Sequence, residues 1–476
     1  MSTLVKEQHK SILLLVFLFF VLSYAFYNTI ADNNFNIMFI AWIILFGVLV
    51  HKSSTLSIVI ILFISFFGNW MEGLGFLPPQ INWLVEVLIL LLFLKALSRK
   101  IFKKEKLYLM GAYVVILFLI ACFFSYLINR NSLIHGLLFL RLTFRYYLLF
   151  LAVINLDFNE KSMKLLNNIL IFLFIIQIPT AVVKLFIYGQ GEAAIGTYGT
   201  HGGGPSTVIP MIAVGFLFPF YFFYKPSKLY LFLAFSFIAF GIIGAKRAII
   251  LFVPITIVFL GWHMRHDFKN ILKYAFIAGM VILLTGYISI KLLPSLNPQK
   301  KIGGEIDLYY IKNSFLEYTM RTYEGKSGGR LATTINVFNI LKTKGLENLF
   351  FGLGPGSYIE TRFAFLKTTL KEADKLPIYY GTTGLSWLVL QTGYTGALVY
   401  LFLFYIILMK SYRYYKSEDR PYWRSFALGI TGFSFIMLII NISYYAVLID
   451  DLISMIYFLL AGLVIKAKEN LEFENL

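Results

Sequence analysis

The sequence predicts an all-α integral membrane protein with about 14 transmembrane helices (about 12 to 14, given some short runs) and one large, partly helical outer loop. Of its 476 residues, 59% are hydrophobic and only 14% are charged, and the mean hydropathy is +0.76. Apolar runs of spanning length recur along the chain, and the loops between them alternate in Lys and Arg content. A lone cysteine, Cys122, excludes a disulfide framework or a thiolate metal site within one chain.

The apolar runs are bounded by Asn, Gly, Pro or charge clusters. The first run follows Lys6 and Lys10 and lacks a small-residue cleavage site, so we expect a retained first helix. Spanning helices are predicted near residues 11–29, 36–50, 54–68, 82–98, 107–128, 133–155, 165–188, 207–224, 228–244, 246–262, 271–293, 382–409, 424–442 and 445–466.

The distribution of basic residues predicts the orientation of these helices. Segments such as SRKIFKKEK and KSYRYYKSEDRPYWR fall on one side with both termini, whereas ADNNFN and GQGEAAIGTYGTHGGGPST fall on the other. Short cytoplasmic loops are rich in Lys and Arg, so both termini are predicted to be cytoplasmic. The formal net charge of +18 fits this anchoring and attraction to anionic membrane lipid, and we expect no nucleic-acid partner.

Three segments are expected within one structural unit: residues 1–293 with eleven helices, the extracytoplasmic loop 294–381, and residues 382–476 with three helices and a short tail. The loop is too long for an ordinary connection, which favours a functional role. Within it, GRLATTINVFNILKTKG (329–345) has Leu331, Ile335, Phe338 and Leu341 at helical spacing. We predict an amphipathic helix lying against the membrane or the helix bundle.

A glycine-rich stretch, FFGLGPGSY, follows that helix and places Gly352, Gly354 and Gly356 at alternate positions. Such a turn brings backbone close to a neighbour, and its amides can contact phosphate or sugar; a purely structural turn is the alternative. Dinucleotide binding is excluded, because the glycine spacing is wrong and no βαβ pattern surrounds it. Nucleotides are not normally available outside the cell, so a phosphate ligand there would be the head of a lipid carrier.

These elements, in order, resemble the O-antigen ligase and polymerase superfamily, which comprises Wzy-type polymerases and lipopolysaccharide O-antigen ligases. The resemblance rests on Gly329-Arg330 opening a loop helix, on NLFFGLGPGSY, and on GLSWLVLQTGYTGALVYLFLF with its Gly393-x-x-Gly396. GTYGTHGGGPSTVIPM and GAKRA resemble further family elements, an outer loop with glycines and a short outer turn with an Arg. Together they cover roughly residues 190 to 410.

The resemblance implies a GT-C-like, metal-independent, inverting glycosyltransferase without a cofactor, in the bacterial cytoplasmic (inner) membrane, with its active site facing outward. Donor and acceptor would be glycans linked to undecaprenyl pyrophosphate, and a chain-length regulator and a flippase would be further partners. Ligases of the family have a His-Asn pair where this sequence has Thr382 and Thr383, which favours a polymerase of surface polysaccharide. A ligase transferring glycan to another acceptor and, from other classes, a flippase of lipid-linked oligosaccharides and a membrane scaffold are the alternatives.

Guanidinium groups can stabilise the departing pyrophosphate, and we assign Arg330 and Arg247 to this catalytic role. A solvated surface position for Arg330 and an interfacial anchor for Arg247 are the alternatives. Arg141 and Arg145 lie four residues apart within an apolar helix and are predicted to bind the pyrophosphate; pairing with Glu86, Asp450 or Asp451 is their alternative. Lys184, near a helix end, is expected to snorkel.

The acceptor hydroxyl calls for a base, and His201 in THGGGPS is our candidate, with a solvated loop histidine as the alternative. Acids of the large loop could serve instead, and an inverting mechanism with a good leaving group can also need little base assistance. The acids considered are Glu305, Asp307 and Glu317. Tyr380 is predicted to contact glycan, as are Tyr309, Tyr310, Tyr379 and Trp387.

Overall fold

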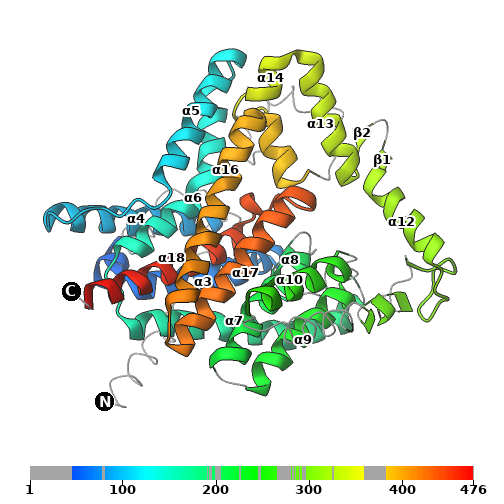
Figure 1. The fold of residues 1–476 in the computed structure, drawn as a ribbon, viewed down its shortest axis with the longest axis horizontal. Coiled ribbons are helices and arrows are strands. Elements are labelled where there is room, and N and C mark those ends of the chain that lie inside the picture. The colour runs from blue at the N-terminus through cyan, green and yellow to red at the C-terminus, as the bar shows by residue number, and fades with distance from the viewer. Residues whose placement is uncertain are drawn as a thin grey trace. The chain divides into compact units, whose positions relative to one another are not determined.

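The computed structural model describes residues 46–77, 81–189, 205–224, 227–244, 248–264, 296–323, 326–358 and 382–474, and between these ranges residues 191, 194, 196–198, 280, 283–284, 286–288 and 290–291. Apart from two antiparallel strands of two residues each, the regular elements in these ranges are helices (Figure 1). Seven of the described helices are long and apolar enough to cross a membrane, which makes the chain an α-helical, multi-pass membrane protein. The chain divides into two compact units, so a single structural unit stays a prediction.

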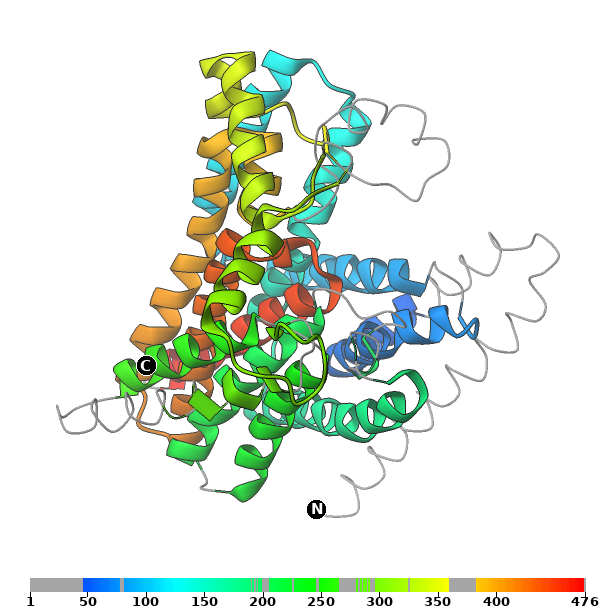
Figure 2. The ribbon, with the colours of Figure 1, turned by 90° about the vertical axis from the view of Figure 1, so that its right-hand side faces the viewer.

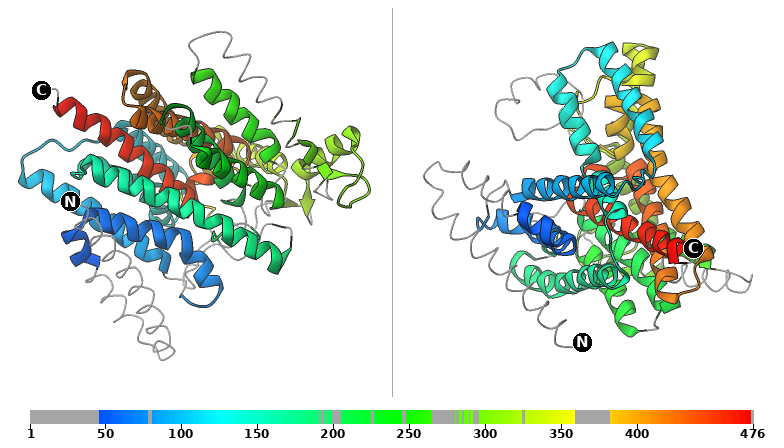
Figure 3. Two further views of the ribbon diagram at one scale, coloured as in Figure 1. Left: turned by 90° about the horizontal axis from the view of Figure 1, so that it is seen from below. Right: turned by 90° about the vertical axis from the view of Figure 1, so that its left-hand side faces the viewer.

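The first unit comprises Met1–Tyr108, Arg145–Gly202 and Phe458–Leu476. Its described helices are α3 (Ser54–Gly73), α4 (Ile81–Phe102), the second half of α6 (Leu133–Asn155), α7 (Glu160–Tyr188) and the end of α18 (Asp451–Glu474). Helices α3 and α4 pack together (Figure 3). Helices α3, α4, α6 and α7 match predicted spans, and each qualifies as membrane-spanning.

A short stretch of the connection after α7, residues 196–198, folds into this first unit. The backbone N–H of Thr197 donates to Gln177 Oε1 of α7 at 2.7 Å, and its hydroxyl donates to the carbonyl of Phe66 in α3, also at 2.7 Å. Lys184, expected to snorkel, instead has only 2% of its surface exposed, with its ammonium 5.5 Å from the ring centre of Trp70. The snorkelling prediction is therefore wrong, because α3 supplies an aromatic ring over the ammonium group.

The second unit comprises Leu109–Phe144 and Gly203–Tyr457. Its longest described helices are α5 (Ala112–Asn129), α16 (Gly384–Ser417) and α17 (Pro421–Ser443), which lie among the shorter α8 (Pro205–Pro219), α9 (Lys228–Ile243) and α10 (Ile249–Met264). A π-helical turn, Phe220–Tyr224, extends α8. Helix α16 packs against both α5 and α17, and α17 packs against α8.

The large loop contributes several described elements to the second unit. They are α12 (Leu308–Met320), the strands β1 (Thr322–Tyr323) and β2 (Lys326–Ser327), α13 (Arg330–Lys344) and α14 (Leu346–Phe351). The strands are antiparallel, with Thr322 opposite Ser327. The predicted helix at 329–345 is confirmed by α13, and Figure 2 shows α13 and α14 beside the end of α5.

Helix α13 does not present its predicted face to the bundle. Its buried residues are Ala332, Thr333, Val337 and Leu341. Leu331, Ile335 and Phe338 are exposed by 39% to 48% and face away from the rest of the unit. Small residues on the buried side allow close approach, so they form the contact with the bundle together with Leu341. Contact of the larger side chains with the membrane, the other surface that the sequence allows, stays a prediction.

Candidate functional site

Arg330 is the first residue of α13, and the junction between α12 and α13 holds it in place. The backbone N–H groups of Gly328 and Gly329 both donate to the carbonyl of Arg321, at 2.9 and 2.8 Å. A Cβ on Gly329 would collide with the backbone of Thr319 and Arg321, so this position requires glycine. The end of α12, with Tyr318, is thereby fixed beside Arg330.

The guanidinium of Arg330 lies between two tyrosines. Its Nε donates to the carbonyl oxygen of Tyr444 at 2.7 Å, and Nη1 donates to the hydroxyl of Tyr318 at 2.9 Å. The guanidinium carbon lies 4.1 Å from the ring centre of Tyr444 and 5.3 Å from that of Tyr318. Within the described residues, no carboxylate forms an ion pair with Arg330. Two of its five N–H groups donate to described residues, and the other three have no acceptor among them.

Tyr444 is itself held by an ordered break between α17 and α18. Its N–H donates to the carbonyl of Ile440, and Asn441 Oδ1 accepts from Leu448 N. Arg330 thus binds a fixed backbone carbonyl, and its orientation is set before any substrate arrives.

The glycine-rich turn packs against three helices at once. Gly352, Gly354 and Gly356 have φ values of +74°, +100° and +87°. A Cβ at these positions would collide respectively with the backbone of α16 around Gln391, with the side chain of Asn131, and with the backbone of His135 in α6. His135 is 7% exposed and lies against this turn. All three glycines are therefore explained by backbone geometry and close packing.

The turn also supplies hydrogen bonds to a sharp kink in α16. Gly393 has φ 67° and ψ −177°, which interrupts the helical ladder. The N–H of Leu353 donates to the carbonyl of Leu390 at 2.8 Å, and Ser125 Oγ donates to the carbonyl of Gln391 at 3.0 Å. In return, Gln391 Oε1 accepts from Gly356 N at 3.0 Å. The kink and the turn satisfy each other's polar groups.

Most amides of the turn are consequently engaged within the protein. Gly352 N donates to Asn348 O and Ser357 N to Gly354 O, in addition to the bonds of Leu353 and Gly356. Two carbonyls of the turn accept from side chains of the α5–α6 connection: Asn129 Nδ2 donates to Gly352 O and Asn131 Nδ2 to Leu353 O. The geometry supports the structural alternative for this turn, and contact of the three glycines with substrate stays a prediction.

Helix α16 begins directly after Thr383, one of the two threonines that the sequence resemblance compares with the ligase His-Asn pair. Thr383 is 1% exposed and forms a capping box with Ser386: Thr383 Oγ1 accepts from Ser386 N, and Ser386 Oγ accepts from Thr383 N. Both hydroxyl groups therefore cap the N-terminus of α16. Thr383 is not placed to act as a base.

Three other predicted residues of this region differ in their exposure and contacts. Trp387 is 4% exposed and stacks on Phe139 with ring centres 5.1 Å apart, whereas Tyr309 is 74% exposed. Asp307 caps α12 by accepting from the N–H groups of Tyr309 and Tyr310. Of the predicted glycan contacts, Tyr309 is accessible and Trp387 is buried in the bundle.

Arg145 forms the ion pair that the sequence left open as an alternative. Its Nη1 lies 2.9 Å from Oε1 of Glu86 in α4, and the two side chains are 10% and 17% exposed. The guanidinium carbon also lies 4.8 Å from the ring centre of Tyr146. Arg141 is partly buried in the same helix α6. The structure thus gives Arg145 a carboxylate partner, and pyrophosphate binding by Arg141 and Arg145 stays a prediction.

Several predicted site residues lie outside the described residues. They are Arg247, His201, Tyr379 and Tyr380. Within the described part of the chain, no group of three or more His, Cys, Asp or Glu side chains is placed to hold a metal ion.

Comparison with known proteins does not identify a family. No family model matches the sequence, and no curated protein matches it.

Sequence reasoning missed the two tyrosines on Arg330 and the polar side chains that support the turn. Tyr444 is 114 residues from Arg330 along the chain, and nothing local connects them. Asn129, Asn131 and Gln391 could have been found, because amide side chains within or at the end of apolar runs are rare unless they have a partner.

We expect Gly356→Ala to lower the free energy of unfolding by about 2–4 kcal/mol, since the new methyl group meets both a positive φ and the backbone of His135. Thermal unfolding in detergent would measure it. Gly303→Ala is the matched control, because Gly303 has φ +79° and a Cβ added there would meet no atom within 4 Å. Equal losses in the two variants would show that close packing contributes nothing.

Glu86→Gln is expected to destabilise the protein by about 3 kcal/mol, because it leaves the Arg145 charge without its carboxylate in a largely buried position. The double variant Arg145→Met, Glu86→Leu should recover most of this loss in the same thermal assay. Recovery in the double variant would identify the ion pair as structural. A double variant as unstable as Glu86→Gln would contradict that role.

Proposed function

We propose that this protein is a GT-C-type glycosyltransferase that polymerises undecaprenyl-pyrophosphate-linked oligosaccharide repeat units into O-antigen or another surface polysaccharide. In this proposal the chain crosses the bacterial cytoplasmic membrane about 14 times, with both termini in the cytoplasm. The observation that carries the proposal is the immobilised Arg330, which has three N–H groups left and no carboxylate partner among the described residues. The sequence resemblance supplies the substrate class.

The chemistry requires a fixed cation at the leaving group. A hydroxyl of the acceptor attacks the anomeric carbon of the donor sugar from the opposite face, and the bond between that carbon and the phosphate oxygen breaks. The electron pair of this bond leaves with the undecaprenyl pyrophosphate, and the hydroxyl proton is released. Arg330 stabilises the charge that develops on the pyrophosphate, with Tyr444 and Tyr318 preventing its reorientation.

The start of α13 adds to this positive potential. Gly329 is the N-cap residue and supplies no side-chain oxygen to the first-turn N–H groups. The partial positive charge of a helix N-terminus favours an anion, whereas it disfavours a cation such as Arg330 standing alone. An anionic substrate at this position would relieve that repulsion, which supports a phosphate ligand over a neutral one.

Polymerisation is tested with purified protein in nanodiscs, supplied with a lipid-pyrophosphate-linked repeat unit and neither nucleotide nor metal. We expect a ladder of lengthening glycans on a gel. Arg330→Ala should lower the rate by about 100-fold or more, and Arg330→Lys nearly as far, because an ammonium cannot reproduce the planar fork of donors. Lys312→Ala, which removes an exposed cation from α12 in the same loop, is the control.

Each alternative predicts a different result. Transfer only when another acceptor such as lipid A core is supplied would make the protein a ligase. Movement of the lipid across a liposome bilayer without glycan transfer would make it a flippase. Normal polymer from Arg330→Lys would refute the bidentate pyrophosphate role of Arg330.

Tyr318→Phe separates orientation of Arg330 from simple charge. The variant keeps the ring and removes the hydroxyl that accepts from Nη1, so we expect a loss of about 1 kcal/mol, or roughly fivefold in rate. The measurement is the initial rate of elongation in the same assay. A rate equal to that of the unmodified protein would show that the ring alone holds the guanidinium.

A further inference from the structure

Helix α14 belongs to the large loop by sequence but lies at the end of a spanning helix in the fold. Helix α5 has 18 residues, so it is roughly 27 Å long and just matches the hydrocarbon thickness of a bilayer. The ring of Phe351, at the end of α14, lies 5.8 Å from the ring of Phe124 in α5. Phe124 precedes the last residue of α5, Asn129, by five residues, or about 7.5 Å of helix.

The apolar surface of α5 continues without interruption onto α14. At this end of α5, the exposed fractions are 58% for Phe123, 48% for Phe124 and 50% for Leu127, as expected for side chains that face lipid. Leu346 and Phe350 of α14 are exposed by 73% and 53%, and their spacing of four residues places them on one face. Two large apolar side chains in water beside a lipid-facing helix would be an unfavourable arrangement.

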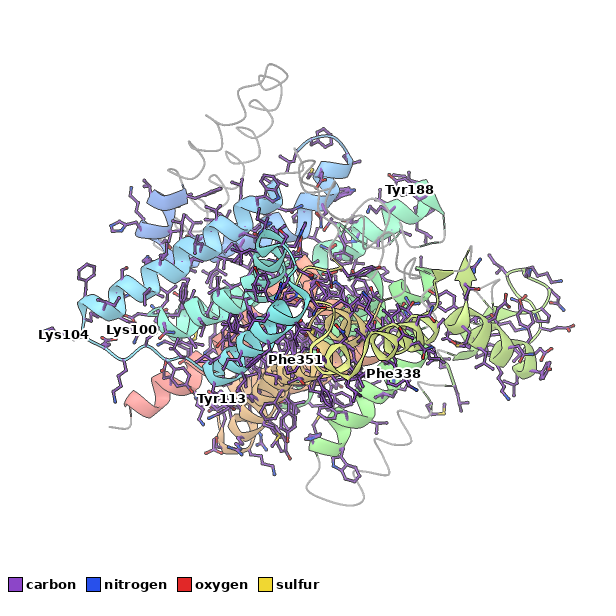
Figure 4. All side chains as sticks on the ribbon, turned by 90° about the horizontal axis from the view of Figure 1, so that it is seen from above. Lys100, Lys104, Tyr113, Tyr188, Phe338 and Phe351 are labelled. Atoms are coloured by element: carbon purple, nitrogen blue, oxygen red, sulfur yellow. The ribbon has the colours of Figure 1, made fainter. Side chains whose placement is uncertain are left out.

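Polar residues flank this apolar face in the manner of an interfacial helix. Lys342 and Lys344, in the last turn of α13, are exposed directly before α14, and Glu347 is exposed in its first turn. Asn129 and Asn131, at the end of α5, bind the glycine-rich turn that follows α14. Figure 4 looks onto α13 and α14 from above, with Phe338 and Phe351 labelled.

We propose that α14 is an interfacial helix, with Leu346 and Phe350 inserted among the lipid acyl chains at the Asn129 end of α5. The partner surface is the lipid bilayer itself, and Lys342 and Lys344 lie at the level of the phosphate head groups. The large loop is thereby anchored to the membrane surface at a fixed depth. This proposal depends on the packing of α14 against α5 and does not require glycosyltransferase activity.

The test uses single fluorescent labels on cysteine. Cys122 is the only cysteine of the chain, and Cys122→Ser provides a background without a native thiol. An environment-sensitive label is placed by Phe350→Cys, by Leu127→Cys as the lipid-facing control and by Lys104→Cys as the water-exposed control. Each protein is reconstituted in vesicles containing lipids with a nitroxide at the head group, or in the upper or lower acyl chain, and is also exposed to aqueous iodide.

We expect the label at position 350 to be quenched most strongly by the upper acyl-chain nitroxide, to within about twofold of the label at 127, and to be protected from iodide relative to the label at 104. Stronger quenching by iodide than by any lipid would overturn the proposal. Protection from both would also overturn it, because protein would then cover this face. Leu346→Cys replaces Phe350→Cys if the latter is not monodisperse by size-exclusion chromatography.

Discussion

The contact between the glycine-rich turn and the kink of α16 is the constraint on which this end of the second unit depends. A kink at Gly393 frees carbonyl groups that an unbroken helix would have bonded internally, and within a membrane protein such groups are costly to leave unsatisfied. Leu353 N and Ser125 Oγ reach the freed carbonyls, and Leu353 can do so only because its neighbouring glycines bring the turn into backbone contact. The kink and the loop therefore require each other.

This mutual requirement changes the interpretation of the glycine motif. Glycines at alternate positions near a suspected phosphate site favour a phosphate loop, but the conformational needs of a tight backbone junction produce the same residue pattern. The two explanations differ in where the amide hydrogens point, and a sequence does not contain that information. Here the amides of Gly352, Leu353, Gly356 and Ser357 all donate to protein oxygens.

Sequence reasoning succeeded where one local signal was sufficient. Hydropathy located α3, α4, α5, α6, α7, α16 and α17, and the spacing and glycines around 329–345 located α13. It failed where the outcome depended on a partner distant in sequence. Lys184 is buried because α3 places Trp70 over it. The periodicity of α13 left membrane and bundle open as the surface beneath its large apolar side chains, and it did not predict the small residues that the helix buries. Such choices depend on tertiary packing, which periodicity does not encode.

Arg145 and Arg330 have the same side chain, but their neighbours suit them to different roles. Arg145 has a carboxylate at ion-pair distance, so its charge is compensated within the protein. Arg330 has a backbone carbonyl, a phenol and two aromatic rings, which fix its direction without neutralising its charge. A group that must stabilise a developing anion needs both fixed geometry and uncompensated charge, because a resident carboxylate would compete with the substrate. By this criterion Arg330 is suited to the role proposed for it at a pyrophosphate, and Arg145 is suited to holding α4 and α6 together.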